Sequence, residues 1–169
     1  LVDTDAIAHE LTGPNGAAMP ALVAEFGLAV ANQLGALDRI AMRQRVFSDP
    51  GARTRLEGIL HPLIRRISIE RCHSAESPYV ILAVPLLVES GTYRQHSDRI
   101  VVVDCPESLQ IKRVMARNGI SADEVKAIMA AQATRAQRLA VADDIVTNDA
   151  DLAKLSLQVE SLHQKYLHL

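Results

Sequence analysis

The longest apolar run in the sequence, Tyr79–Glu89, constrains the fold most strongly. It reads Tyr-Val-Ile-Leu-Ala-Val-Pro-Leu-Leu-Val-Glu, with β-branched residues mixed into it. Because both sets of alternating positions are apolar, Tyr79–Val84 predicts a strand that is covered on both faces, as in the interior of a parallel sheet. Pro85 then removes a backbone donor, and Glu89 follows on the loop. In open α/β sheets the ligand crevice lies beyond this carboxyl end.

The composition narrows the possible partners. The chain has 169 residues, three Tyr, two Phe, no Trp and a formal net charge of -2. We therefore expect neither nucleic acid nor a membrane as a partner, and the apolar run is too short to span a bilayer. Cys72 and Cys105 lack metal or redox spacing, and no histidines pair at helical spacing. We expect reduced thiols in a cytoplasmic protein without a metal site built from His and Cys, and the sequence defines no oligomeric state.

The amino-terminal residues predict the end of a short buried strand followed by acids. Leu1-Val2 precedes Asp3-Thr4-Asp5, without an initial Met or a signal-peptide pattern. We expect a further segment ahead of Leu1. Asp5 suits a base that accepts a hydroxyl proton, or a cap for a helix that starts near Ala6, and the sequence leaves both open. Asp3 and Asp5 together also suit outer-sphere binding of Mg²⁺.

Helical patterns fill the chain from residue 6 to residue 77. Helices are expected from about Ala17 to Phe26, from Leu37 to Phe47 and after Ser48-Asp49-Pro50. Pro62 is expected to kink or restart the last of these. The segment therefore predicts a helical lobe without a strong strand pattern.

The second half of the chain alternates strands and helices. Arg99–Cys105 predicts a buried strand, and Pro106 then starts a helix at once. Ser121 and Glu124 form a capping box that starts another helix, expected to run towards Leu139. A last strand at Ala142–Asn148 precedes a closing helix with one apolar stripe, from Leu152 to Tyr166. This order is typical of a parallel α/β sheet.

Four arginines carry the clearest indication of a ligand. Arg113 and Arg117 share a helix face, and Arg135 and Arg138 lie beyond a predicted hairpin of two helices. Guanidinium groups give bidentate bonds to phosphate oxygens, so a mobile hairpin of this kind suits polyphosphate; the alternative is a solvated face. The sequence contains neither Gly-x-x-x-x-Gly-Lys-Ser/Thr nor Gly-x-Gly-x-x-Gly.

Six blocks of the sequence, in order, resemble the dephospho-CoA kinases, which are P-loop kinases. The blocks are Asp3-Thr4-Asp5 with His9, Leu37-Asp38-Arg39 with Phe47, Leu60-His61-Pro62-Leu63-Ile64, Pro85-Leu86-Leu87-Val88-Glu89, Gln110–Arg113 with Arg117 and Ala131-Gln132, and Ala142-Asp143 through Asn148. The His-Pro pair is particularly diagnostic. The resemblance runs nearly from end to end.

The resemblance implies an α/β fold with a P-loop-kinase-like parallel sheet flanked by helices. A discontinuous nucleotide-binding core (1–5, 78–111 and 139–169) would carry a helical acceptor lobe for CoA (6–77) and a helical-hairpin lid (112–138). The implied activity is transfer of the ATP γ-phosphoryl group, with Mg²⁺, to the ribose 3′-hydroxyl of dephospho-CoA, the last step of coenzyme A biosynthesis. ATP and dephospho-CoA would be the partners.

The resemblance also implies roles for single residues. Asp5 would be the base or orienting carboxylate, and Arg113 with Arg117 would neutralise charge on the transferring phosphoryl group as the lid closes. Substrate-binding residues would be Asp3, His61, Pro85, Glu89 and Arg117, and nucleotide-binding residues would be Arg135, Arg138 and Asn148. Helix packing for His61 and a plain surface position for Glu89 remain alternatives.

Two alternatives to this function remain at the level of sequence. One is another P-loop kinase of small acceptors, such as nucleosides or nucleotides, and the other is a non-catalytic nucleotide-binding module. We further expect the 169 residues alone to transfer phosphate poorly, because the family's P-loop and its lysine would lie upstream of Leu1.

Overall fold

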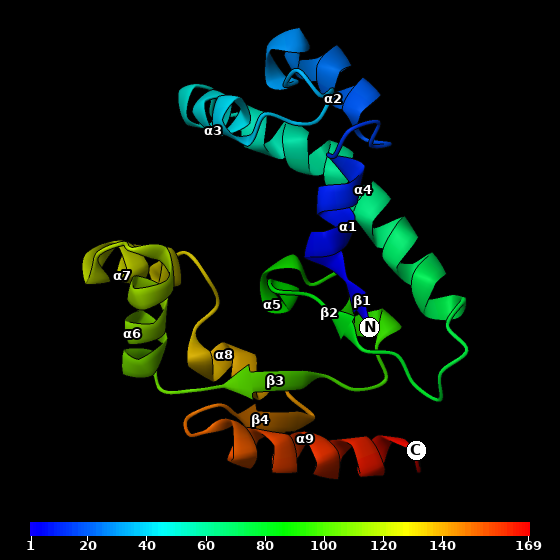
Figure 1. Cartoon of the computed structure of the whole chain (residues 1–169), viewed down its shortest axis with the longest axis vertical. Coiled ribbons are helices and arrows are strands. Elements are labelled where there is room, and N and C mark those ends of the chain that lie inside the picture. The colour runs from blue at the N-terminus through cyan, green and yellow to red at the C-terminus, as the bar shows by residue number, and fades with distance from the viewer. The chain divides into compact units, whose positions relative to one another are not determined.

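The computed structural model describes residues 1–169, which divide into two compact units, Leu1–Pro85 and Leu86–Leu169. Each unit contains one small parallel sheet flanked by helices (Figure 1). This confirms the predicted α/β class with parallel strand pairing. None of the helices is both long and apolar enough to cross a membrane.

The sheet of the first unit consists of β1 (Val2–Asp3) and β2 (Leu82–Ala83). The predicted strand over Tyr79–Val84 is therefore too long, because only two of its residues pair. It is also less covered than predicted, since Ile81 is 55% exposed and the neighbouring apolar residues are half-buried. A sheet of two short strands buries few side chains on either face, which explains the difference.

Four α-helices and a 3₁₀ turn make up the rest of the first unit. They are α1 (Thr4–Leu11), α2 (Met19–Phe26), η1 (Leu28–Val30), α3 (Arg39–Ser48) and α4 (Ala52–His73). Helices α1 and α2 pack on α4 around a core that includes the fully buried Ile7 and Leu22. Burial of a side chain of this size contributes about 1.5–3 kcal/mol. The helices predicted for this segment are thus present.

Helix α4 runs without interruption through Pro62, so the restart expected there as the alternative to a kink is wrong. Proline removes the backbone donor to the carbonyl of Gly58. Gly58 and Pro62 both lie on the exposed side of α4, where water can replace that donor. The opposite side, with Leu63 and Ile64, packs against the core and holds the helix together.

The second unit contains β3 (Val101–Asp104) and β4 (Asp144–Thr147), paired in parallel so that Val101 lies opposite Asp144. Its helices are α5 (Leu87–Ser90), η2 (Arg94–His96), α6 (Glu107–Asn118), α7 (Ala122–Ala130), α8 (Arg135–Ala140) and α9 (Leu152–Tyr166). The strand-to-helix order, the capping box at Ser121 and the closing helix agree with the predictions.

The helix predicted to run from Ser121 to Leu139 is instead two helices, α7 and α8. Thr134 ends the connection between them, because its hydroxyl accepts a hydrogen bond from the backbone N–H of Gln137 at 3.2 Å. In return, the backbone N–H of Thr134 donates a hydrogen bond to the side-chain oxygen Oε1 of Gln137 at 2.8 Å. This second capping box starts a new helix and separates Arg135 and Arg138 from the α6–α7 hairpin.

Candidate active site

Two neighbouring acids at the start of α1 have different roles. The Oδ1 atom of Asp3 accepts hydrogen bonds from the backbone N–H groups of Asp5 and Ala6, at 2.8 and 3.3 Å. Asp3 is therefore the helix cap, and the capping role considered for Asp5 is wrong because α1 begins two residues earlier than expected, at Thr4. Asp5 lies in the first turn with an exposed side chain.

Thr4 fixes the position of this first turn. Its hydroxyl donates a hydrogen bond to the backbone carbonyl of Ala83 at 3.0 Å, and its side chain is buried. The contact ties α1 to the carboxyl end of β2, beside Pro85, which is exposed. The backbone that carries Asp5 is thus held by the sheet on one side and by the Asp3 cap on the other.

A basic pair lies one helical turn beyond Asp5. The guanidinium Nη2 of Arg39 donates to Nδ1 of His9 at 3.1 Å and to the hydroxyl of Thr12 at 3.3 Å. Arginine has no acceptor, so Nδ1 of His9 must be the acceptor and the ring carries its proton on Nε2. Arg39 was not among the predicted site residues. Asp38 caps α3, and a helix cap can be recognised in a sequence. Recognising this cap would have placed Arg39 at the first position of α3.

His61 lies on the exposed side of α4, next to Pro62. The exposed position does not favour the helix-packing alternative. It leaves the imidazole accessible to a ligand.

Glu89 holds the segment that leads into α8. Its Oε1 atom accepts a hydrogen bond from the backbone N–H of Ala133 at 2.7 Å. Arg138 donates to the carbonyl of the same residue at 2.5 Å. Glu89 is exposed, as the alternative of a plain surface position predicts, but its carboxylate also binds a backbone group 44 residues away.

Arg113 and Asn148, both predicted as site residues, are brought together. The Nη1 atom of Arg113 donates to the backbone carbonyl of Asn148 at 2.7 Å, and the N–H of Asn148 donates to the carbonyl of Asp104 at 2.7 Å. The contact links α6 to the end of β4. Arg117, one turn further along α6, is exposed and donates only to Asn118, at 2.8 Å.

Arg135 forms a two-point ion pair with Asp104, the last residue of β3. Its Nε and Nη2 atoms donate to the two carboxylate oxygens at 2.8 and 2.6 Å. The hydrogen bond from Arg135 holds the pKa of the Asp104 carboxyl below its ordinary value. The four arginines therefore do not form one open face. Arg113 and Arg117 lie on α6, where Arg113 binds the carbonyl of Asn148, whereas Arg135 and Arg138 lie on α8 and bind Asp104 and Ala133.

A magnesium ion that accompanies ATP usually takes one or two protein carboxylates, with phosphate and water oxygens completing its shell. The donors at α1 fit this requirement. Asp5 is exposed, and both cap bonds of Asp3 go to a single carboxylate oxygen. A site made by protein alone is absent, since no three His, Cys, Asp or Glu side chains are grouped where they could hold a metal.

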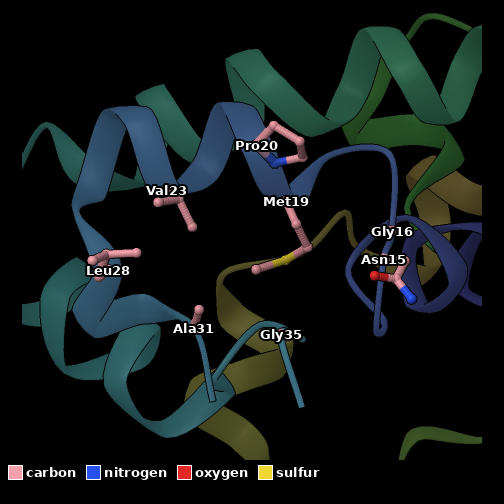
Figure 2. A pocket seen from close by; sticks show the side chains of 8 residues that line it. All are labelled: Asn15, Gly16, Met19, Pro20, Val23, Leu28, Ala31 and Gly35. Carbon is pink, nitrogen blue, oxygen red and sulfur yellow. The ribbon is translucent and has the colours of Figure 1, made fainter. Parts of the chain in front are cut away.

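The first unit also contains an apolar groove of about 540 Å³ beside α2. Met19, Val23 and Leu28 point into it, with Ala31 and Gly35 on the facing loop and Asn15 at the end near α1 (Figure 2). No sequence pattern predicts this groove, because it forms between residues that are up to 20 positions apart.

Comparisons with known proteins agree with the resemblance. A family model described as dephospho-CoA kinase matches residues 1–154. The dephospho-CoA kinase of Dechloromonas aromatica (strain RCB) is 76% identical over 169 residues, which cover 100% of this chain and 82% of that protein. The dephospho-CoA kinase of Thiobacillus denitrificans is 54% identical over 169 residues, which cover 100% of this chain and 84% of that protein.

Solved structures show the same similarity. The dephospho-CoA kinase of Campylobacter jejuni has a TM-score of 0.72 at 26% identity, covering 97% of this chain and 83% of its own. The protein TT1252 of Thermus thermophilus has a TM-score of 0.79 at 32% identity, with the same coverage of 97% and 83%. The chain therefore belongs to the dephospho-CoA kinases, P-loop-fold enzymes that use ATP to phosphorylate dephospho-CoA in the last step of coenzyme A biosynthesis.

Proposed function

We propose that Asp5 is the base, or the orienting carboxylate, that accepts the proton of the ribose 3′-hydroxyl of dephospho-CoA as its oxygen attacks the γ-phosphorus of ATP. The observation that carries this proposal is that the two acids at the start of α1 have different contacts. Asp3 takes the cap, so the exposed carboxylate of Asp5 remains available on backbone that is held on both sides. A base in kinases works mainly by holding the hydroxyl in line with the phosphorus.

Arg113, with Arg117, is proposed to neutralise the charge of the transferring phosphoryl group. Arg113 uses one donor atom on the carbonyl of Asn148, and a guanidinium has five N–H donors, so most of its fork remains for phosphate oxygens. The bond to Asn148 also fixes the direction of the side chain. A fixed donor aimed at developing charge stabilises a transition state without reorganising during the reaction.

Arg135, Arg138 and Asn148 are proposed to contact the nucleotide. The contacts of the two α8 arginines add a condition to this role. Arg135 must exchange its bonds with Asp104, and Arg138 its bond with Ala133, for bonds to phosphate. Asn148 needs no such exchange, because only its backbone is engaged with Arg113 and Asp104.

Asp3, His61, Pro85 and Glu89 are proposed to shape the acceptor side. Asp3 does so through the cap of α1, and His61 through its exposed imidazole on α4. Pro85 and Glu89 follow β2, and Glu89 also positions the start of α8 through Ala133.

The proposed division of the chain follows these roles. Residues 6–77 would hold the acceptor, residues 112–138 would form the lid, and the remaining segments, 1–5, 78–111 and 139–169, would form the nucleotide-binding core. Helices α6 and α7, which pack against each other, support a hairpin lid.

Mg²⁺ is proposed to enter with ATP, where it would neutralise charge on the phosphate oxygens. Asp5 and the second oxygen of Asp3 are the groups that would hold it through water. We place the protein in the cytoplasm, where ATP is available, and the free thiols of Cys72 and Cys105 suit a reducing compartment.

A coupled assay tests the substrate assignment. Protein expressed from the whole reading frame that contains this sequence is supplied with ATP-Mg²⁺ and either dephospho-CoA, nucleosides or nucleoside monophosphates. The proposal predicts turnover with dephospho-CoA far above the other acceptors. Equal or faster turnover with a nucleoside or its monophosphate would contradict it.

A further inference from the structure

Helix α8 is attached to the second unit with little buried surface. It is six residues long, and none of them is buried. It lies beside β3, and the two-point ion pair between Arg135 and Asp104 joins its first residue to the end of that strand (Figure 1). Glu89 binds the backbone just ahead of α8, at Ala133. Elements with few buried contacts open at low free energy. Polar bonds, rather than a buried core, therefore hold α8 in place.

The ion pair leaves Arg135 poorly able to attract a further anion. Its Nε and Nη2 atoms donate to the two carboxylate oxygens of Asp104, at 2.8 and 2.6 Å. The side chain of Asp104 is 10% exposed, so water and salt screen its charge little. A phosphate at the free Nη1 atom would meet the charge of this carboxylate as well as that of the guanidinium. Strong phosphate binding at Arg135 therefore requires the bonds to Asp104 to be given up.

Arg113 is held at the same edge of the β3–β4 sheet in a different way. Its Nη1 atom donates to the neutral backbone carbonyl of Asn148 at 2.7 Å, which leaves its positive charge unbalanced. The N–H of Asn148 in turn donates to the carbonyl of Asp104 at 2.7 Å. The ends of β3 and β4 thus hold one arginine whose charge is available, Arg113, and one whose charge is balanced, Arg135.

Asp104 does not lose every donor when Arg135 leaves. The pKa of its carboxyl is lowered most by the hydrogen bond from Arg135, and to a smaller extent by the charge of Arg138 and by the backbone N–H of Cys105. Cys105 follows Asp104 directly in the chain, so this donor stays in place when α8 moves. Arg135 can therefore exchange Asp104 for another anion without leaving a nearly buried carboxylate unbonded.

We propose that Asp104 is a positioning residue that holds Arg135 in the nucleotide-free enzyme and yields it to the phosphates of ATP. This inference rests on the proposed contact between Arg135 and the nucleotide. ATP and Asp104 then compete for one guanidinium, so the apparent dissociation constant of ATP is the intrinsic one divided by the fraction of molecules in which Arg135 is free. The empty site keeps α8 fastened to β3, and nucleotide binding releases it.

Calorimetry with ATP-Mg²⁺ and no acceptor tests this proposal on protein expressed from the whole reading frame. The variants are Asp104→Asn, Arg135→Gln and the double variant, with Asp98→Asn as the matched control. Asn has the shape of Asp and can still accept one bond from Arg135, so Asp104→Asn should fold. Asp98 is exposed just ahead of β3, and its replacement removes the same charge from the same unit.

Asp104→Asn is expected to bind ATP about tenfold more tightly than the wild type, because Arg135 is free in more of the molecules. Arg135→Gln should bind ATP about tenfold more weakly, since it loses a charge-assisted contact to phosphate. The double variant should bind ATP as Arg135→Gln does, because Asp104 acts only through Arg135. Asp98→Asn should stay within about twofold of the wild type, because solvent screens an exposed charge. Loss of structure does not produce a gain in affinity.

A crystal structure of the wild type with Mg²⁺ and a non-hydrolysable ATP analogue tests the exchange without a variant. The guanidinium of Arg135 is expected on the phosphates, with both of its bonds to Asp104 broken. A structure in which Arg135 contacts the phosphates and keeps both bonds to Asp104 would overturn the inference.

Two binding results separate this inference from the proposed function. If Arg135→Gln weakens ATP binding but Asp104→Asn does not strengthen it, the inference is overturned and the nucleotide contact of Arg135 stands. If Arg135→Gln binds ATP as tightly as the wild type does, both the nucleotide contact and the inference are overturned.

Discussion

The carboxylate of Asp3 accepts a hydrogen bond from the backbone N–H of Asp5 at 2.8 Å. One acid of this pair is thereby committed to the start of α1, while the other stays exposed. The arrangement separates a structural carboxylate, Asp3, from the proposed catalytic one, Asp5, within two residues. It also makes opposite predictions for substitutions at the two positions.

Asp3→Ala should lower the free energy of unfolding by about 1 kcal/mol, because two N–H groups at the helix start lose their acceptor. Asp3→Ser, which can still cap, should recover most of the loss. Asp5→Asn should change stability by only a few tenths of a kcal/mol, about the effect of removing one charge near a helix N-terminus. Urea unfolding of the three variants measures this. A larger loss for Asp5→Asn than for Asp3→Ala would contradict the assignment of the cap.

Local patterns in the sequence predicted most of the helices. The capping box at Ser121 and Glu124, Pro106 before α6 and the apolar stripe of α9 act through residues three or four positions apart. Interactions of this range are visible in a sequence. The errors, a helix restart at Pro62 and a long strand over Tyr79–Val84, arose where packing, rather than local preference, decides the structure.

The candidate site was predictable only in part. Asp5 and Arg113 were predicted from their place beside a strand end and on a helix together with the family resemblance, and their roles stay predictions. The pairing of Arg135 with Asp104 joins residues 31 positions apart, and that of Arg39 with His9 residues 30 apart. No sequence pattern defines such pairs, because the tertiary fold brings them together. For the same reason the groove at Leu28 could not be foreseen.

A second prediction concerns pH. Asp144 accepts hydrogen bonds from Nε of Arg99 and the hydroxyl of Tyr166, both at 2.7 Å, and from Lys165. The bond from Arg99 is the main reason that the pKa of Asp144 lies well below its ordinary value. Because the folded state favours the ionised form, this stabilisation is complete above about pH 4 and is lost as the pH falls towards the lowered pKa.

Asp144→Asn should therefore lower the free energy of unfolding at pH 7, and the gap to the wild type should narrow below about pH 4. Denaturant titrations at about four pH values between pH 3 and pH 7 measure this difference in the free energy of unfolding. Asp123→Asn is the matched control, since its side chain is 93% exposed. A gap that stays constant over the whole range would show that the charge of Asp144 is not what stabilises the fold.

Glu89→Ala should loosen the connection into α8. The backbone N–H of Ala133 loses its carboxylate acceptor, so its hydrogen exchange should become about tenfold faster, as expected for loss of one hydrogen bond. Glu89→Gln keeps an acceptor oxygen and should exchange nearly as slowly as the wild type. Amide exchange followed by NMR measures both. If the N–H of Ala133 exchanges equally fast in Glu89→Ala and the wild type, Glu89 does not hold this connection.

Arg113→Lys should lower kcat by about 100-fold, because an ammonium group does not reproduce the planar fork and its bond to Asn148. Arg53→Lys is the control, since Arg53 forms only an exposed pair with Glu57. Steady-state kinetics with saturating ATP and dephospho-CoA compare the two variants. Unchanged turnover in Arg113→Lys would leave Arg113 with a structural role only.

Asp5 is proposed to accept the proton of the dephospho-CoA hydroxyl. The most direct measurement is kcat for 3′-phosphorylation by Asp5→Asn, made in protein expressed from the whole reading frame and compared with the wild type and Asp123→Asn. If Asp5 has this role, kcat of Asp5→Asn falls by about 100-fold or more, with little change in KM for ATP, while Asp123→Asn keeps wild-type turnover. Wild-type turnover in Asp5→Asn would show that Asp5 does not take part in the reaction.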